Sequence, residues 1–369
     1  MNWIFNFIAK KPNSINVISS VLAIVMGLIF GLILMFIVNP SNALLGFWTI
    51  LSGPLSDMRN MGFLIFYSTP IILTGLSVAF AFRTGLFNIG ATGQLTVGAF
   101  FGLYVGVNWT FLGPFHWLVA ILAAALGGAI WGGITGMLKA YRNVNEVVSS
   151  IMLNYVALYM VNLLILSTIY GGRSEAMRPA SSAQLPVLFL DNLFPRSPIN
   201  IGIFIALFVA AILHIILNYT TFGYELKSVG LSRSAAKYAG IKEKRSIVTS
   251  FLIAGAIAGI AGGIMYLVGD RTFRINEQLL EQGFTGIAIA LLGLSSPIGV
   301  VLAGLFYGSI LRGGDAAQRI FREEIIDIII AVIIYFSALS LFTKQVISNM
   351  VRKRTKKEVE IAEKEGDVG

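Results

Sequence analysis

The sequence has 369 residues, of which 56% are apolar and only 12% charged, with no cysteine and a formal net charge of +9. A soluble domain carries about twice that share of charged residues, so the composition indicates an integral membrane protein. The lack of cysteine excludes disulfides and thiolate metal sites. In a membrane protein, positive charge indicates which loops are cytoplasmic, so the net charge of +9 is not taken as a sign of nucleic-acid binding.

Apolar runs long enough to cross a bilayer recur along the chain. The first, Val17–Val38, exceeds a signal-peptide core of about 7–15 residues and is predicted to be a retained helix. Further spans are predicted near 62–82, 86–107, 115–138, 147–169, 201–218, 247–268 and 325–343. The glycine-rich region 284–311 is interrupted at Ser295-Ser296-Pro297 and is interpreted as two short passes. We therefore expect an all-α polytopic bundle of about ten crossings.

Lysine placement gives the expected orientation. With the N-terminus inside and an even number of crossings, every lysine falls on the cytoplasmic side, as the positive-inside rule requires. The residues concerned are Lys10, Lys11, Lys139, Lys227, Lys237, Lys242, Lys244, Lys344, Lys353, Lys356, Lys357 and Lys364. A single pass over 284–311 would move the basic C-terminal region outside. We expect both termini in the cytoplasm, a permease domain over 1–348 and a charged tail over 349–369 that lies near lipid headgroups.

The stretch RTGLFNIGATGQLTVGAF, residues 83–100, is both polar and membrane-embedded. Glycines allow backbones to approach closely, and polar side chains in a span face a cavity or a partner rather than lipid. Asn88 and Gln94 are six residues apart and would not face the same way on a regular helix. A break at Gly-Ala-Thr-Gly would bring both amides to one lumen; the alternative is that they only tie neighbouring helices together.

A second stretch, GFTGIAIALLGLSSPIGVVLAGLFYG at 283–308, has the same character. Two broken, glycine-rich segments in the two halves of a chain indicate a transport path near the bilayer midplane. We expect Asn88, Thr92 and Gln94 of the first stretch, and Phe284 and Thr285 of the second, to line that path.

Several function classes are disfavoured by what the sequence lacks. No glycine is followed by lysine, so the phosphate-binding loop of an ATPase is absent. There is no HExxH motif, and His116 and His214 are more consistent with packed or interfacial residues than with metal ligands. We expect no cofactor and no metal site. Carboxylates deep in the spans, which ion-coupled carriers use, are missing; Asp327 is interpreted as an interfacial cap.

The loop of about 219–246 is the longest on the lysine-rich side. Within it, Ser232 is predicted to cap a short helix of Arg233 to Tyr238, and Gly240 to stop it. The helix is expected to have a small, close-packing face of Ala235, Ala236 and Ala239, surrounded by the charges of Lys237, Lys242, Lys244 and Arg245. On the other side, Tyr170–Asn200 is interpreted either as a connector or as a docking surface for an external partner.

Three segments together carry a resemblance to a known family: RTGLFNIGATGQ followed by VGAF, GLSRSAAKYAGI at 230–241, and the stretch at 283–308. They resemble permease subunits of bacterial ABC importers, in the branched-chain amino acid and ribose-type superfamily. The FNIG-x-x-GQ pattern at 87–94 is most similar to its nucleoside-uptake branch. The chain departs from the pattern at Thr92, where many relatives carry glutamate. The likeness extends from about 60 to 343.

This resemblance implies a type II ABC-importer-like fold in the bacterial cytoplasmic membrane, with alternating access and no enzymatic activity of its own. It also implies a cytoplasmic ATPase held by a coupling helix, which would consist of Ser232, Arg233, Ala235, Ala236, Lys237, Tyr238 and Gly240. Further implied partners are a second permease subunit, identical or homologous, and a lipid-anchored or periplasmic binding protein. The expected solute is a nucleoside, with a monosaccharide such as ribose or galactose as the alternative; an ion-coupled carrier remains the rival from another class.

Overall fold

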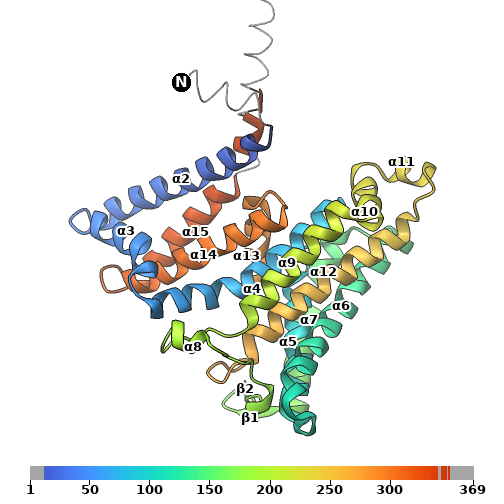
Figure 1. Cartoon of the computed structure of the whole chain (residues 1–369), viewed down its shortest axis with the longest axis horizontal. Coiled ribbons are helices and arrows are strands. Elements are labelled where there is room, and N and C mark those ends of the chain that lie inside the picture. The colour runs from blue at the N-terminus through green and yellow to red at the C-terminus, as the bar shows by residue number, and fades with distance from the viewer. Residues whose placement is uncertain (1–11, 340–341, 347, 350–369) are drawn as a thin grey trace, which may run out of the picture. The chain divides into compact units, whose positions relative to one another are not determined.

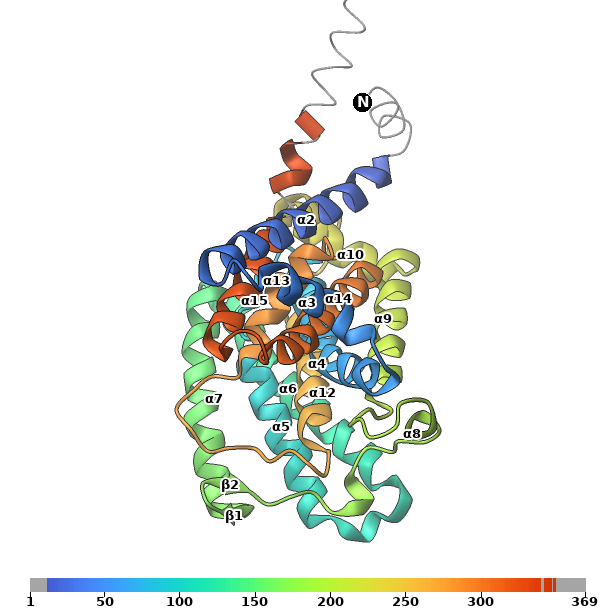
Figure 2. The same cartoon turned by 90° about the vertical axis from the view of Figure 1, so that its left-hand side faces the viewer.

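The computed structural model describes residues 12–339, 342–346 and 348–349, most of them in helices (Figures 1 and 2). The long helices are α2 (Pro12–Val38), α4 (Met58–Arg83), α5 (Ala91–Asn108), α6 (His116–Arg142), α7 (Glu146–Thr168), α9 (Gly202–Tyr219), α12 (Glu243–Tyr266), α14 (Pro297–Ala317) and α15 (Glu323–Ala338). Shorter ones are α3 (Ala43–Ser52), α8 (Leu190–Leu193), α10 (Thr221–Leu231), α11 (Arg233–Tyr238) and α13 (Glu281–Leu292). The 3₁₀ helices are η1 (Gly53–Leu55), η2 (Thr110–Phe115) and η3 (Ser181–Ala183).

The all-α class expected from the sequence is confirmed. Seven helices of the described residues are long and apolar enough to cross a membrane: α2, α4, α6 together with η2, α7, α9, α12 and α14. The chain is thus a multi-pass membrane protein. Helix α5 corresponds to the predicted span 86–107 but begins later, and α13 is a short helix. Neither is among the seven helices, so the total of about ten crossings stays a prediction.

The chain folds into two compact units, one of Trp48–Arg319 and one of the described residues up to Phe47 and from Ile320 onward. In the smaller unit, α2 packs on α15. The rings of Phe30 and Phe336 stack with centroids 4.0 Å apart and an interplanar angle of 3°. The predicted tail boundary at 349 meets the end of the described residues, and residues 350–369 lie outside them.

The core of the larger unit is a bundle in which α5, α6 and α12 approach very closely. A Cβ atom at Gly255 of α12 would overlap the Gly128 carbonyl oxygen of α6, and one at Gly262 would overlap the Leu95 carbonyl oxygen of α5. Small residues therefore let the backbones touch where larger side chains would hold the helices apart.

The break predicted at Ser295-Ser296-Pro297 is confirmed. Helix α13 ends at Leu292, and α14 begins at Pro297 with proline in its first turn, where the missing N–H is harmless. Leu294 and Ser295 between them have φ of 51° and 52°, and Gly293 lies against Val300. The chain therefore reverses here, and α13 and α14 form a helical hairpin.

The two ends of the larger unit carry different elements. Helices α10 and α11 lie at one end, whereas α8 and the strands β1 (Tyr170–Gly172) and β2 (Glu175–Ala176) lie at the other (Figures 1 and 2). The loop predicted at 170–200 is structured: Ala176 donates its N–H to the Phe273 carbonyl at 2.9 Å, and Leu185 donates to that of Leu267 at 2.9 Å. This loop and the segment after α12 therefore cover one end together.

Candidate functional site

The polar stretch 83–100 begins with an irregular segment, residues 84–90, between α4 and α5. Its first turn depends on Gly85, whose φ of +69° lies in the left-handed region, which glycine adopts without steric cost. Gly230 of α10 approaches so closely that a Cβ on either glycine would come 2.8 Å from backbone atoms of the other segment. The segment after α4 therefore lies directly against α10.

Asn88 and Gln94 form a reciprocal amide pair at the start of α5. The Asn88 Nδ2 atom donates to Gln94 Oε1 at 3.0 Å, and Gln94 Nε2 donates to Asn88 Oδ1 at 3.1 Å. Both side chains are fully buried. The predicted break does bring these two amides together, because α5 begins only at Ala91. In this conformation each amide has the other as partner, and whether they line a lumen stays a prediction.

A residue that was not expected from the sequence, Asn154 of α7, holds this helix start. Its Oδ1 atom accepts a hydrogen bond from the Gly93 N–H at 2.9 Å, and its Nδ2 atom donates to the Ile89 carbonyl at 3.1 Å. Gly90 precedes the helix and has no side chain with which to cap it. Asn154 therefore supplies from a neighbouring helix the cap that local sequence does not.

Thr92, the third expected residue of this stretch, is buried in the first turn of α5. A Cβ at Gly283 of α13 would overlap its Oγ1 atom, so the starts of α5 and α13 are in contact. Among the residues described, Thr92 Oγ1 has no hydrogen-bond partner, and neither do Ser150 Oγ and Trp131 Nε1 nearby. The first glycine-rich stretch thus touches the second at Thr92.

The two residues expected on the second stretch lie near this contact but face elsewhere. Phe284 is 40% exposed, and the Thr285 hydroxyl donates to the Glu281 carbonyl at 3.1 Å within its own helix. Their neighbour Gln282 instead lines a cavity. The assignment of Phe284 and Thr285 to the path stays a prediction.

The outer cavity, of about 600 Å³, lies at the end of the larger unit that carries α8. Aromatic residues of α4 form one wall, and the remaining lining comes from 184–200 and 268–271. Small-molecule sites are typically about 300–1,000 Å³ with mostly apolar walls and few polar groups. The lining residues are Phe63, Phe66, Tyr67, Gln184, Leu185, Val187, Arg196, Ser197, Pro198, Ile199, Asn200, Val268, Gly269, Asp270 and Arg271.

The inner cavity, of about 200 Å³, adjoins the outer one. Its lining comes from α4, α12, α13 and α14 and from Arg271: Tyr67, Pro70, Ile71, Met265, Arg271, Gln282, Leu311 and Asp315. Neither cavity was expected from the sequence. The available signal was the spacing of Phe63, Phe66 and Tyr67 at i, i+3 and i+4, which places three aromatic rings on one helix face.

At the opposite end, the predicted cap of α11 is confirmed in detail. Ser232 accepts a hydrogen bond from the Ala235 N–H through its Oγ atom at 3.3 Å, the helix spans Arg233–Tyr238, and Gly240 follows with a φ of +81°. Serine is a preferred N-cap, and glycine tolerates the left-handed conformation after a helix.

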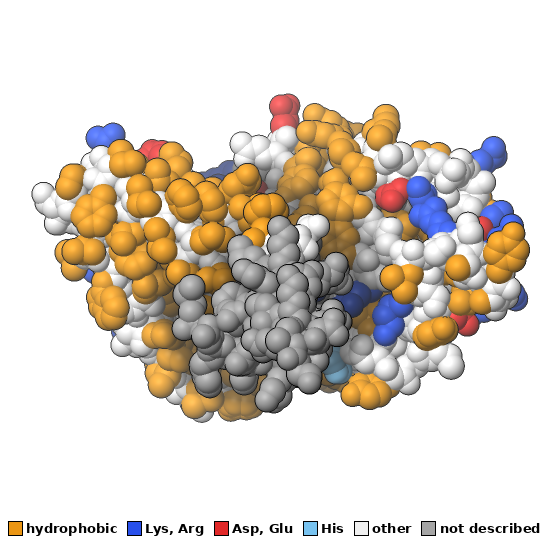
Figure 3. All heavy atoms as spheres, turned by 90° about the horizontal axis from the view of Figure 1, so that it is seen from above, with side chains coloured by type: hydrophobic (Ala, Val, Ile, Leu, Met, Phe, Trp, Pro, Cys, Tyr) orange, Lys and Arg blue, Asp and Glu red, His pale blue; other side chains and the backbone are white. Residues whose placement is uncertain are grey.

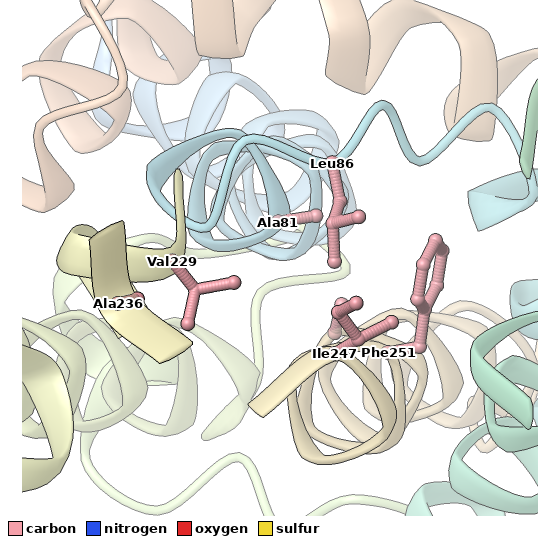
Figure 4. Packing of buried hydrophobic residues seen from close by; sticks show 7 residues of the cluster. Ala81, Leu86, Val229, Ala236, Ile247 and Phe251 are labelled. Carbon is pink, nitrogen blue, oxygen red and sulfur yellow. The ribbon is translucent and has the colours of Figure 1, made fainter. Parts of the chain in front are cut away.

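The inward face of α11 differs from what was expected. Ala236 is buried at 3% exposure and joins a cluster with Val229 of α10, Ala81 of α4, Leu86 just after α4, and Ile247, Phe251 and Ala254 of α12 (Figure 4). Ala235 and Ala239 are exposed, so the alanines do not form the single close-packing face that was predicted. Alanine at 236 lets α11 lie flat on this cluster.

The outward face of α11 carries large exposed side chains. Tyr238 is 94% exposed and Leu231, at the preceding helix end, is 89% exposed. The basic residues Lys237, Lys242, Lys244 and Arg245, in and just after α11, are exposed too. Figure 3 looks onto this end and shows Lys and Arg side chains on its right, over the unit that contains α10 and α11. Exposed apolar groups rimmed by charge are typical of a protein contact.

His116 is a packed residue, as expected. It is fully buried, with Nδ1 at 2.8 Å from the Ser182 Oγ atom and Nε2 at 2.9 Å from the Val105 carbonyl oxygen. In the part of the chain that the structure describes, no group of three or more His, Cys, Asp or Glu side chains could hold a metal ion.

Comparisons with known proteins agree on one family. The family model described as "Branched-chain amino acid transport system / permease component" matches residues 60–338. The guanosine ABC transporter permease protein NupP of Bacillus subtilis is 38% identical, over 90% of this chain and 96% of its own. The nucleoside ABC transporter permease protein NupB of Lactococcus lactis is 32% identical, over 87% and 90%. The glucose ABC transporter permease protein TsgB13 of Haloferax volcanii is 33% identical, over 75% and 76%. No solved structure matches.

Proposed function

The chain belongs to the family of permease components of the branched-chain amino acid transport system, and from that premise we propose that it imports nucleosides as the membrane subunit of an ABC transporter. It is a transport component rather than an enzyme. The observation that carries the nucleoside assignment is the match to a guanosine permease over 90% of this chain and 96% of the relative. A glucose permease at 33% identity keeps a monosaccharide as the second candidate.

The coupling element of the proposed importer is α11. A short capped helix is rigid enough to transmit a movement of the ATPase to the membrane helices, whereas a flexible loop would not transmit it. Tyr238 and Leu231 point outward for an ATPase to contact, while Ala236 fixes the helix to α4, α10 and α12. The exposed lysines around it favour a cytoplasmic location for this end. With the even number of crossings expected from the sequence, both termini are also assigned to the cytoplasmic side of a bacterial cytoplasmic membrane.

The opposite end is the proposed external mouth. It carries the structured loop 170–200 and the outer cavity, so a binding protein would deliver the solute there. A second permease subunit, identical or homologous, would complete the path with this one. Nucleotide binding to the ATPase pair would close one end while the other opens.

The proposed path includes the expected residues Asn88, Thr92 and Gln94, together with Phe284 and Thr285. Amides suit a nucleoside because they both donate and accept hydrogen bonds, as ribose hydroxyls and base edges do. The buried Asn88–Gln94 pair corresponds to a closed path in this conformation. Opening the path would exchange their mutual hydrogen bonds for bonds to the solute.

Uptake by the reconstituted transporter tests this function. The permease, its partner permease, the ATPase and the binding protein are placed in liposomes, and entry of labelled guanosine is measured with ATP inside. We expect ATP-dependent uptake that excess uridine or guanosine suppresses, with ribose and glucose without effect. Equal suppression by ribose would favour the monosaccharide assignment. Uptake driven by an ion gradient without ATP would instead indicate a secondary carrier.

A further inference from the structure

The outer cavity has an aromatic wall that is covered by a cation, and the two rings of this wall, Phe66 and Tyr67, are inclined to each other by 53°. Phe66 and Tyr67 of α4 line this cavity. The guanidinium carbon of Arg271 lies 5.0 Å from the Phe66 ring centroid and 5.6 Å from that of Tyr67. Such cation–π contacts place a planar group over ring faces. The wall therefore already holds one planar, hydrogen-bonding group, and a planar ligand of similar character could take its place.

Polar side chains line the same cavity as this aromatic wall, among them Gln184, Asn200 and Asp270. The Asn200 Oδ1 atom accepts from the Gly202 N–H at 2.9 Å, which fixes its orientation. Asp270 is exposed next to Arg271 and its carboxylate can accept from two neighbouring donors, such as ribose hydroxyls or base N–H groups.

Arg271 lies where the outer cavity meets the inner one. Among the described residues, Tyr67 and Arg271 are the two that line both cavities. The inner cavity contains Gln282, whose Oε1 atom has no hydrogen-bond partner among the described residues. A buried acceptor without a partner is costly, so the inner cavity offers one unmet contact to a solute that has passed Arg271.

We propose that the outer cavity is a binding site for the base of a nucleoside, which stacks on Tyr67, beside the inclined ring of Phe66, in place of the Arg271 guanidinium. This rests on the proposed function and on the cavity end being external. Stacking on an aromatic face serves every base because each has a π-face. Displacing Arg271 also removes the side chain between the two cavities, so binding of the base opens the way to Gln282.

Photolabelling of the complete purified transporter tests the site directly. The probe is labelled 8-azidoguanosine, added without binding protein, and adducts are located by mass spectrometry. We expect adducts in the peptide of α4 that contains Phe66 and Tyr67, reduced by excess guanosine but not by ribose. Stacking on an aromatic side chain carries enough affinity that Tyr67→Leu should reduce labelling on the order of tenfold.

Two further variants separate the site from a general structural effect. Arg271→Ala removes the competitor for the ring faces and should increase labelling, the opposite of Tyr67→Leu. Tyr67→Phe keeps the ring and should label like the unchanged protein. The matched control is Phe208→Leu on α9, an aromatic residue that is 66% exposed and outside both cavities, and it should leave labelling unchanged.

The outcomes distinguish this inference from the proposed function. If the unchanged transporter imports guanosine but adducts lie away from α4 and 268–271, the site assignment is wrong while the function stands. The same holds if Tyr67→Leu and Arg271→Ala both label normally. Competition by ribose equal to that by guanosine would mean that the cavity binds sugar and not base. If guanosine does not enter at all, the function fails and this inference fails with it.

Discussion

The Nε atom of Arg83 donates a hydrogen bond to the carbonyl oxygen of Ser295 at 2.9 Å. This contact ties the last residue of α4 to the turn between α13 and α14. Two residues further on, Gly85 lies against Gly230 of α10. Arg83 therefore lies between α10, which precedes the proposed coupling helix α11, and the hairpin whose other end contacts Thr92.

Replacing Arg83 by Gln should uncouple transport from ATP hydrolysis. The lost hydrogen bond is partly exposed and contributes about 1 kcal/mol, so we expect the protein to remain folded with a small drop in melting temperature. Guanosine uptake should fall severalfold while the ATPase stays bound and hydrolyses ATP. Uptake and hydrolysis are measured on the same liposomes. Normal uptake by the variant would show that this contact transmits nothing.

Replacing Asn88 alone by Leu should destabilise the protein. Its removal leaves the buried Gln94 amide without a partner, which costs about 1–3 kcal/mol. The double variant Asn88→Leu with Gln94→Leu removes both polar groups and should recover most of that stability. Thermal unfolding in detergent of Asn88→Leu, Gln94→Leu and the double variant completes a double-mutant cycle.

Guanosine uptake by the same variants then separates a structural role from a path role. A path role predicts that the double variant stays inactive although its stability is restored. If uptake returns with stability, the two amides only hold the start of α5 in place. Asn154→Leu, which removes the cap of α5 without touching either amide, is the control for helix disruption alone.

The two alanines of α11 form a matched pair for testing the coupling helix. Ala236→Trp forces a large ring into the cluster with Val229 and Phe251, and overpacking of this kind costs about 1–3 kcal/mol or more. We expect the isolated permease to melt at a lower temperature. Ala235→Trp adds the same ring on the exposed face and should leave that melting temperature unchanged.

In the assembled transporter, Ala235→Trp should still abolish ATPase binding, as measured by co-purification. Tyr238→Ser should weaken it too, because Tyr238 is 94% exposed. Charge reversal at Lys237 should do less, since an exposed ion pair at the rim contributes under about 1 kcal/mol. Normal ATPase binding by Ala235→Trp would mean that α11 is not the contact.

Single cysteines test the orientation in a chain that has none of its own. Ser234 on α11 and Ser181 in η3 lie at opposite ends of the larger unit and are both exposed. An impermeant thiol reagent applied to intact cells should label Ser181→Cys and spare Ser234→Cys until the cells are opened. The reverse pattern would invert the orientation that we propose.

Features that depend on neighbouring residues were predictable from the sequence. The cap at Ser232, the stop at Gly240 and the interruption before Pro297 were all predicted, because each follows from the conformational preferences of one or two residues. The apolar runs likewise predicted most helices. The seven long apolar helices follow from composition and length alone.

Features that depend on distant partners were not predictable. The direction in which Ala236 points is set by Ala81, Leu86 and Phe251, which are far away in the sequence. The cap that Asn154 gives to α5 comes from 61 residues further along. The outer cavity needs α4 to meet the segment after α12, and no local pattern indicates that Arg271 will lie on Phe66.

The contact of α6 with α12 also restricts how the protein can move. At Gly255 the backbone of α12 touches the Gly128 carbonyl, and no side chain lies between the two helices there. Rotation of one helix against the other would bring backbone atoms into collision, so we expect α6 and α12 to move as one rigid body. Because α12 begins just after α11, a displacement of α11 would move this helix pair as a whole. The hinges of the transport cycle must then lie in the connections around it, not inside it.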